Sequence, residues 1–162
     1  MHLLDANAFM EANRLYYAFD IAPRFWTWLG DPSLAGQVAS IDAIKDEITA
    51  GTGDLIEWAR ALPSTFWFPD SDDVVTAMTE LAAWSTDPSR SFRQAAVDEF
   101  LGSADLKLVA HAIAVGATVV TRERSEPESR KKIKIPDVCI AFGVDWTDPF
   151  SAYRSLGMRL VA

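Results

Sequence analysis

The chain has 162 residues, of which 49% are hydrophobic, enough for one buried core and too few to favour two, so we expect a single domain over residues 1–162. Its net charge of −8 argues against a protein whose main task is to coat nucleic acid with positive charge. There is no run of about 20 apolar residues, and the start lacks the basic and apolar regions of a secretory signal. We therefore expect a cytoplasmic protein.

The amino-terminal part is expected to begin with a strand and to continue as helix. Residues 2–4 are largely apolar and are typical of a short buried strand, which places Asp5 at the carboxyl end of that strand. A helix is expected to start near Ala8. An aromatic-rich stretch over residues 16–28 then favours helices packed on the core, with an exposed surface that stacks on bases as the alternative.

The middle of the chain shows helical periodicity interrupted by one strand. Apolar residues at positions 38, 41, 44 and 48 are three or four positions apart, which predicts one amphipathic helix over residues 33–50. A short helix is expected over residues 55–62 and a strand over residues 65–68. The polar residues 70–73 offer N-caps for a helix over residues 74–84, and another helix is expected over residues 92–101.

The last third of the chain contains an α/β unit. Residues 106–116 show the pattern of a strongly apolar helix that ends at Gly116, and residues 117–121 follow at once as a buried strand. After a charged loop, a second strand is expected over residues 138–142. Because helix, glycine and strand in this order are typical of α/β proteins, we predict a three-layer α/β/α fold with a short central parallel sheet.

Acidic residues are expected to meet at the carboxyl edge of this sheet, where open parallel sheets bind their ligands. Asp5 ends the first strand, and Glu123 follows the strand over residues 117–121 by two positions. Asp105 lies in the first turn of a helix that runs antiparallel to the strands, and Glu47 borders the buried stripe of its helix. Taken singly, these acids could equally be a strand-end cap, a helix N-terminal acid or solvated charges.

Together, the acids predict a metal site. Several carboxylates within a few ångströms repel one another unless a cation neutralises them, and ligands that are all oxygen atoms suit Mg²⁺ or Mn²⁺. Such a cation can activate water for attack on phosphorus, so we expect hydrolysis of phosphodiester bonds. Zinc chemistry is disfavoured because one cysteine and two histidines cannot build the usual sites, and Cys139 and His111 are expected to be packed side chains.

These residues resemble a known family. The stretch Leu3-Leu4-Asp5-Ala6-Asn7-Ala8-Phe9-Met10 is similar to the opening of PIN-domain nucleases, and the region from Asp105 to Thr121 is similar to that family's third acid with the helix and fourth strand that follow. The likeness extends over most of the chain to a PIN-like group of bacterial proteins, DUF4411, through Arg14-Leu15-Tyr16-Tyr17, Asp46-Glu47 and Lys134-Ile135-Pro136-Asp137-Val138-Cys139.

The resemblance implies a metal-dependent endoribonuclease with a PIN-like fold. Its catalytic residues would be Asp5, Glu47, Asp105 and Glu123. The ligands of Mg²⁺ or Mn²⁺ would be Asp5, Asp105 and Glu123, and the supporting residues Asn7, Thr121 and Asp137. The chain departs from many PIN domains where Thr121-Arg122-Glu123 stands in place of Thr-Asn-Asp, because the longer side chain of glutamate shifts the site.

The resemblance also implies partners. PIN proteins of this size resemble the toxins of bacterial toxin–antitoxin pairs, which cleave RNA and are silenced by a cognate antitoxin protein; a homodimer is a further option. A basic segment would contact the RNA backbone, unless it is only a solvated loop. Its cations are Arg122, Arg124, Arg130, Lys131, Lys132 and Lys134.

Two other functions remain open. Asp5 could be the nucleophile of a phosphatase of the haloacid-dehalogenase type, but those enzymes carry a second aspartate where this chain has Asn7. The chain could also be a non-catalytic PIN-fold module that binds RNA or a partner without cutting. Metal binding separates the two main hypotheses, because a nuclease of this kind should be stabilised by its ion and an inert module should not.

Overall fold

A parallel five-stranded sheet forms the centre of the molecule in the computed structural model, which describes residues 1–161. The strands are β1 (His2–Leu4), β2 (Val38–Ile41), β3 (Trp67–Phe68), β4 (Thr118–Val120) and β5 (Trp146–Thr147), in the spatial order β3-β2-β1-β4-β5. All four neighbouring pairs are parallel. The carboxyl ends of the strands therefore share one edge of the sheet, with β1 at its centre.

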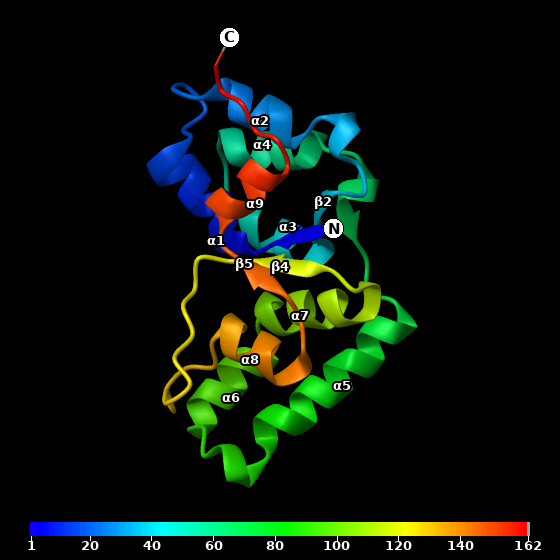
Figure 1. Cartoon of the computed structure of the whole chain (residues 1–162), viewed down its shortest axis with the longest axis vertical. Helices are drawn as coiled ribbons and strands as arrows, with labels where there is room; N and C mark the ends of the chain where they lie inside the picture. The colour runs from blue at the N-terminus through cyan, green and yellow to red at the C-terminus, as the bar shows by residue number, and fades with distance from the viewer. Residues whose placement is uncertain (162) are drawn as a thin grey trace.

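Helices cover both faces of this sheet. They are α1 (Ala6–Glu11), α2 (Pro23–Leu29), α3 (Asp42–Ile48), α4 (Asp54–Ala61), α5 (Asp72–Thr86), α6 (Gln94–Leu101), α7 (Ala104–Val115), α8 (Ile135–Phe142) and α9 (Pro149–Ser155). Shorter turns are the π-helical η1 (Ala12–Tyr16) and the 3₁₀ turns η2 (Pro32–Leu34), η3 (Ser64–Phe66) and η4 (Pro88–Arg90). Figure 1 shows α1, α2, α4 and α9 on one side of the sheet and α5 to α8 on the other, which confirms the predicted three-layer α/β/α fold.

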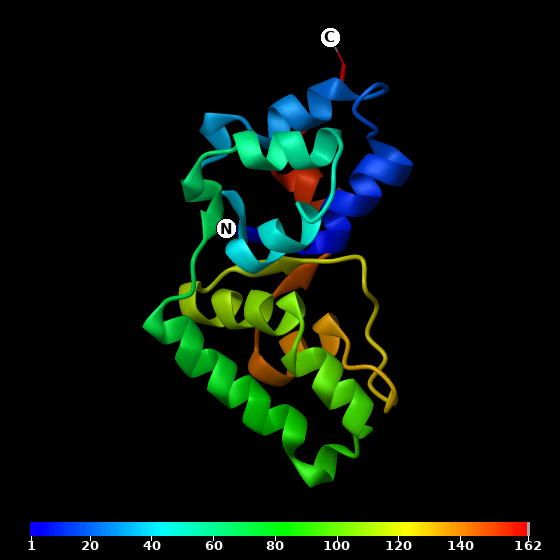
Figure 2. The same cartoon turned by 180° about the vertical axis from the view of Figure 1, so that it is seen from behind.

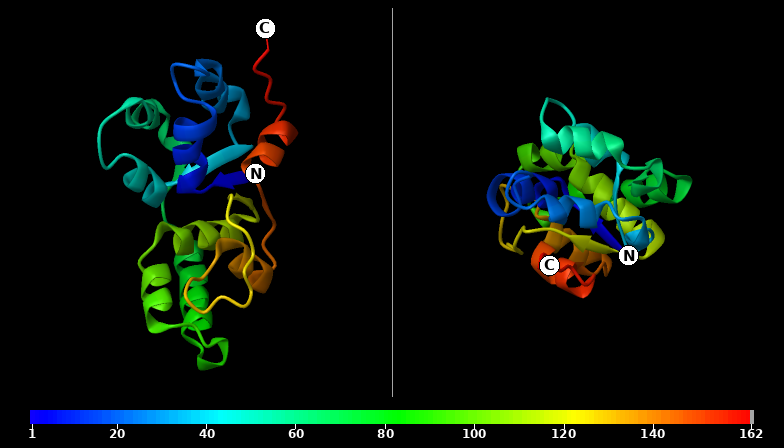
Figure 3. Two further views of the ribbon diagram at one scale, coloured as in Figure 1. Left: turned by 90° about the vertical axis from the view of Figure 1, so that its left-hand side faces the viewer. Right: turned by 90° about the horizontal axis from the view of Figure 1, so that it is seen from above.

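The layer of α5 to α8 positions the basic segment. Helices α5 and α7 lie side by side beneath the sheet (Figure 2) and make the most extensive helix–helix contact of the described chain. The loop from β4 to α8 runs along this layer beside α6 and α8 (Figure 3). Within it, the carbonyl of Arg130 accepts a 2.9 Å hydrogen bond from the N–H of Arg93, at the start of α6, so the loop is fastened to that helix.

The helix predicted over residues 33–50 is wrong in its first half. Residues 38–41 form β2, which is buried along its whole length, and Ile41 is also the N-cap residue of α3. A central parallel strand is apolar at nearly every position. Because a helix follows β2 without a break, the apolar positions shared by the two elements imitate a continuous helical repeat.

The strand predicted over residues 138–142 is also wrong, because these residues belong to α8. Pro136 stands in the first turn of α8, a position that suits its fixed φ, and Gly143 ends the helix with φ +67°. The apolar run resembled a buried strand only because α8 packs Val138 and Cys139 into the core. The last strand is instead the two-residue β5, too short to be predicted from the sequence.

The other predicted elements have small errors at their ends, whereas α9 was not predicted. The strand over residues 65–68 shrinks to β3, because residues 64–66 form η3. The aromatic stretch packs mainly on the core, with Phe25 and Trp26 buried, and Cys139 is a buried thiol whose pKa burial raises to about 12. Within residues 1–161, no helix combines the length and the apolar character that crossing a membrane requires.

Candidate functional site

Asp5 lies at the centre of the carboxyl edge, immediately after β1. Its backbone N–H donates a 3.0 Å hydrogen bond to the carbonyl of Val120, which continues the pairing of β1 with β4. Its side chain caps α1, because Oδ1 accepts a 2.7 Å hydrogen bond from the N–H of Ala8. The strand end and the helix start thus fix this carboxyl group, which is only 1% exposed.

Within residues 1–161, the second oxygen of Asp5 has no hydrogen-bond partner. Oδ2 is buried and unpaired, although buried carboxylate oxygens are normally satisfied. Burial raises the pKa of Asp5 to about 7, and the negative charges of Asp105 and Glu123 add to this, while the Thr121 hydroxyl and the Ala8 N–H oppose it. Asp5 is therefore a buried acid that lacks the neutralising partner that such a group needs.

Asp105 approaches the same edge from the first turn of α7. Burial raises the pKa of Asp105 to about 6, and the charges of Glu123, Glu47 and Glu99 contribute in the same direction. Lys132 is the cation that opposes this rise. The helix begins here because Ser103 is in extended conformation and Asp105 suits the positive end of the helix dipole.

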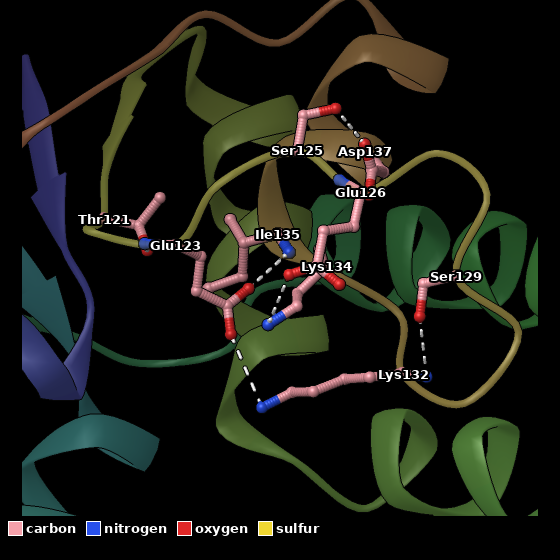
Figure 4. A network of polar contacts seen from close by, with 9 residues as sticks. All are labelled: Thr121, Glu123, Ser125, Glu126, Ser129, Lys132, Lys134, Ile135 and Asp137. Carbon is pink, nitrogen blue, oxygen red and sulfur yellow. Dashed lines mark hydrogen bonds and ion pairs between the residues drawn. The ribbon is translucent and has the colours of Figure 1, made fainter.

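Glu123 joins the group through the loop that follows β4, but both of its oxygens are engaged by the protein. Oε2 accepts a 2.8 Å hydrogen bond from the N–H of Ile135, the first residue of α8, and Oε1 lies 3.6 Å from the Lys132 Nζ (Figure 4). Its own N–H donates to the Thr121 hydroxyl at 3.1 Å. Glu123 therefore anchors the loop and the start of α8, in addition to placing negative charge beside Asp5 and Asp105.

The structure brings Asp5, Asp105 and Glu123 within reach of one another's charge, with Glu47 at the margin. Glu47 is exposed on α3, and its charge contributes to the raised pKa of Asp105. Within residues 1–161, no three His, Cys, Asp or Glu side chains form a ready-made metal site. The donor set still fits a hard divalent ion, because the buried, unpaired Oδ2 of Asp5 supplies a free ligand and the neighbouring acids supply charge.

The three predicted supporting residues lie in different surroundings. Thr121 is buried beside Asp5, as support of that carboxyl requires. Asn7 is exposed in the first turn of α1, with no hydrogen bond to Asp5 among the described contacts. Asp137 lies on the outer side of the loop, where its oxygens accept hydrogen bonds from the Ser125 hydroxyl and the Glu126 N–H (Figure 4), so it holds the loop rather than the acids.

The basic segment divides into anchored and free cations. Arg122 is anchored, because its Nη1 lies 3.1 Å from the Glu11 carboxylate and donates to the Tyr16 hydroxyl, while its guanidinium covers the Tyr16 ring. Lys132 pairs with Glu123, and Lys134 lies 3.7 Å from Glu126. The other three predicted RNA-binding residues are exposed, and no ion pair is found for them within residues 1–161: Arg124, Arg130 and Lys131.

Two residues near the acids, Glu99 and Tyr153, were not predicted from the sequence. Glu99 lines a small cleft together with Asp105 and Lys132, and Tyr153 of α9 is buried with a hydroxyl that has no hydrogen-bond partner within residues 1–161. Burial and then the charge of Asp5 raise the pKa of Tyr153. Their positions depend on how α6, α9 and the β4–α8 loop pack, and no local motif marks them.

His111 belongs to a separate polar cluster on α7. Its Nε2 lies 3.1 Å from Asp70 Oδ1, and Lys107 Nζ lies 2.6 Å from Asp70 Oδ2. Burial lowers the pKa of His111, which favours the neutral ring. These contacts tie α7 to the segment that follows β3, so His111 is a satisfied, buried histidine.

Comparison with known proteins gives one family. The family model described as "Domain of unknown function (DUF4411)" matches residues 2–160, which is nearly the whole chain. No curated protein and no solved structure resembles the chain closely enough to count as a match. The description of the family names no activity.

Proposed function

We propose that this chain, which belongs to the DUF4411 family, is a metal-dependent endoribonuclease that hydrolyses RNA phosphodiester bonds. The observation that carries the proposal is the carboxyl group of Asp5. It is buried at the carboxyl end of the central strand, one of its oxygens is unpaired, and Asp105 and Glu123 add negative charge beside it. Such an arrangement is costly for a fold and useful to an enzyme that binds a cation.

The acids have two different roles in this proposal: some bind the metal ion, and Glu123 positions the β4–α8 loop. Asp5 and Asp105 would hold Mg²⁺ or Mn²⁺, because burial and the neighbouring acids raise the pKa of both carboxyl groups and a bound cation would favour their charged forms. When bound, such an ion supplies an activated water at neutral pH and offsets charge at the scissile phosphate. Glu123 completes the negative edge, and its bond to the Ile135 N–H holds the β4–α8 loop over it.

Lys132 provides the positive charge that an RNA backbone needs near the acids. Its Nζ lies 3.6 Å from Glu123 and its side chain is 44% exposed, so a phosphate can replace the carboxylate as its partner. The anchored Arg122 is less suited to this task, because Glu11 and Tyr16 already occupy its guanidinium. We therefore assign the RNA contact to the part of the basic segment that follows Arg122.

The resemblance to PIN-domain toxins supports a narrower proposal, that the enzyme acts in the cytoplasm as the toxin of a toxin–antitoxin pair. The chain length and the opening residues 3–10 carry that resemblance. A neighbouring reading frame for a small DNA-binding or peptidase-like protein would support the pairing with an antitoxin. Its absence would count against the toxin role and would leave the nuclease proposal intact.

Cleavage of RNA by the purified protein tests the proposal. We expect cleavage of unstructured RNA with Mn²⁺ and none with EDTA. Asp5→Asn and Asp105→Asn should each lower the rate by at least about 100-fold, because loss of a direct ligand costs more than loss of a supporting contact. Asp20→Asn is the matched control, since Asp20 is an exposed aspartate outside the carboxyl edge.

Two results would contradict the nuclease assignment. One is equal activity in Mn²⁺ and in EDTA, and the other is full activity of the Asp5→Asn variant. Circular dichroism of each variant separates loss of chemistry from loss of fold. Asn keeps the oxygen that accepts from the Ala8 N–H, so the helix cap survives this substitution.

A further inference from the structure

A second cavity lies beside the acidic edge and belongs to none of the catalytic assignments. It has a volume of about 400 Å³ and opens between the end of α5, η4, the β4–α8 loop and α8. Its lining includes two aromatic and four basic side chains: Trp84, Phe92, Arg90, Arg130, Lys132 and Lys134. A cavity of this size is within the range of pockets that hold small ligands.

Flat groups cluster around Trp84 in the lining of the pocket. The guanidinium of Arg90 lies 5.1 Å from the centre of the Trp84 ring, and the Phe92 ring lies 5.5 Å from that of Trp84. Phe142 supports Trp84 from α8, with ring centres 5.9 Å apart. Guanidinium and aromatic planes are the surfaces on which unpaired bases stack in single-stranded nucleic acids, whereas bases in a duplex are covered by their neighbours.

The rim of the pocket is positive. Four cations and two acids, Glu126 and Asp137, line the pocket, and both acids already have partners within the protein. Asp137 accepts hydrogen bonds from Ser125 and from the Glu126 N–H, and Glu126 lies 3.7 Å from Lys134 (Figure 4). Arg130 is exposed, and no ion pair is found for it in the described part of the chain, so it remains available for phosphate.

Lys132 connects this pocket to the acidic edge. It lines the pocket, pairs with Glu123, and also lines the small cleft that contains Asp105. A chain of phosphates that passes Lys132 therefore has the carboxylates on one side and the pocket on the other.

We propose that the pocket binds one nucleotide of single-stranded RNA, with its base against the Arg90–Trp84 pair and its phosphate between Arg130 and Lys132. The identity of the polymer rests on the proposed nuclease function. The pocket is then a substrate-binding site that presents the neighbouring phosphodiester to Asp5 and Asp105. Duplex RNA cannot fill it, because a paired base does not leave its stack without cost.

Binding in the presence of EDTA tests the pocket separately from the chemistry. The probe is a fluorescein-labelled single-stranded RNA of mixed sequence, followed by fluorescence anisotropy, with its duplex as comparator. Arg90→Ala should weaken binding of the single strand by roughly tenfold, the typical size of one lost stacking contact. Arg130→Ala should lower the slope of affinity against salt concentration on logarithmic axes by about 0.7, the value for one phosphate contact of a single strand.

Both substitutions change exposed side chains, so neither threatens the fold. Trp84→Leu, which is half-buried, serves only as a second variant for the stacking contact. The control is Arg24→Ala, an exposed arginine of α2 on the other side of the sheet (Figure 1), and we expect it to leave affinity and salt slope unchanged.

The outcomes separate this proposal from the nuclease assignment. Unchanged binding in both Arg90→Ala and Arg130→Ala overturns the pocket, as does a wild-type protein that binds duplex as tightly as single strand or binds no RNA. Weakened binding in these variants, with wild-type affinity in Arg24→Ala, supports it. If those results came with no cleavage in Mn²⁺, the pocket would stand and the nuclease assignment would fall.

Discussion

Asp5 combines a structural role with a destabilising one. Its Oδ1 caps α1, which favours folding, whereas its buried and unpaired Oδ2 opposes ionisation inside the protein. A side chain kept in this state weakens the fold, and such weaknesses are common at functional sites. Two features of this carboxyl group therefore indicate a functional site: its position directly after β1 and the stability that the fold loses by burying it.

The raised pKa of Asp5 predicts how the stability of the protein depends on pH. The pKa of Asp5 is about 7 in the folded chain against an ordinary value of 3.8, so the folded state binds the proton more tightly. Stability from this group is complete below about pH 4 and is lost as the pH rises through about 7. Asp5→Asn should therefore raise the free energy of unfolding by roughly 2–4 kcal/mol at about pH 8 in EDTA, and by less at about pH 5.

Urea denaturation of wild type and Asp5→Asn at several pH values measures this difference directly. Other groups titrate in the same range, and their contributions cancel when the two proteins are subtracted at each pH. Burial lowers the pKa of His111, for example, so its contribution is present above about pH 6.5 and is lost as the pH falls. A pH-independent difference between wild type and Asp5→Asn would show that Asp5 is ionised as readily in the fold as in water.

At the scale of elements, helix α7 positions Asp105 at the carboxyl edge of the sheet. Its first turn holds Asp105 at the carboxyl edge, and Asp70, after β3, fixes its side through Lys107 and His111. Its far end is set by Gly116, which adopts φ +65° and lets the chain turn back at once into β4. Both ends of α7 are therefore defined by local chemistry, and this explains why the helix was predicted well.

This gives a prediction for the turn between α7 and β4. A Cβ on Gly116 would meet nothing within 4 Å, so Gly116→Ala introduces only the strain of a left-handed backbone. We expect it to lower the free energy of unfolding by roughly 1–2 kcal/mol. Gly102→Ala is the matched control, because Gly102 has φ −90° and its Cβ would make an ordinary 3.4 Å contact. It should be neutral or stabilising by up to about 1 kcal/mol.

Thermal denaturation of the two variants checks the prediction. A Gly116→Ala protein as stable as the wild type would show that the backbone at this position relaxes out of the left-handed region. The change should leave cleavage by the remaining folded protein intact, since Gly116 lies at the opposite end of α7 from Asp105.

At the scale of the whole molecule, the acids come from segments that are far apart in the sequence. Asp5 follows β1, Asp105 begins α7 and Glu123 follows β4, so they meet only when the sheet and its helices have assembled. A cation that binds them binds the folded state alone. Metal binding and folding should therefore be coupled.

We accordingly expect Mn²⁺ or Mg²⁺ to stabilise the protein. At a free concentration about 100-fold above the dissociation constant, the gain should be about 2.7 kcal/mol, and it should be larger at about pH 8 than at about pH 5, where Asp5 is protonated. Differential scanning calorimetry against NaCl of equal ionic strength measures it. Asp5→Asn should lose most of the gain, and an equal gain in both proteins would place the ion elsewhere.

Much of this architecture is determined by the sequence alone, because local rules suffice. An apolar run that ends at Asp5 defines a strand end, and an apolar helix that ends at Gly116 before another apolar run defines an α/β unit. Since parallel strands end at one edge, these two features already place Asp5, Asp105 and Glu123 near one another.

Tertiary structure decided what local rules leave ambiguous. Residues 38–41 and 138–142 are both apolar, and only packing makes one of them a central strand and the other a helix. Packing also places both oxygens of Glu123 in contact with Ile135 and Lys132. The pocket that contains Arg90 and Trp84 likewise forms only in the folded chain, because its residues precede α6 and follow α7 in the sequence. Such contacts depend on distances between elements, which periodicity along the chain does not encode.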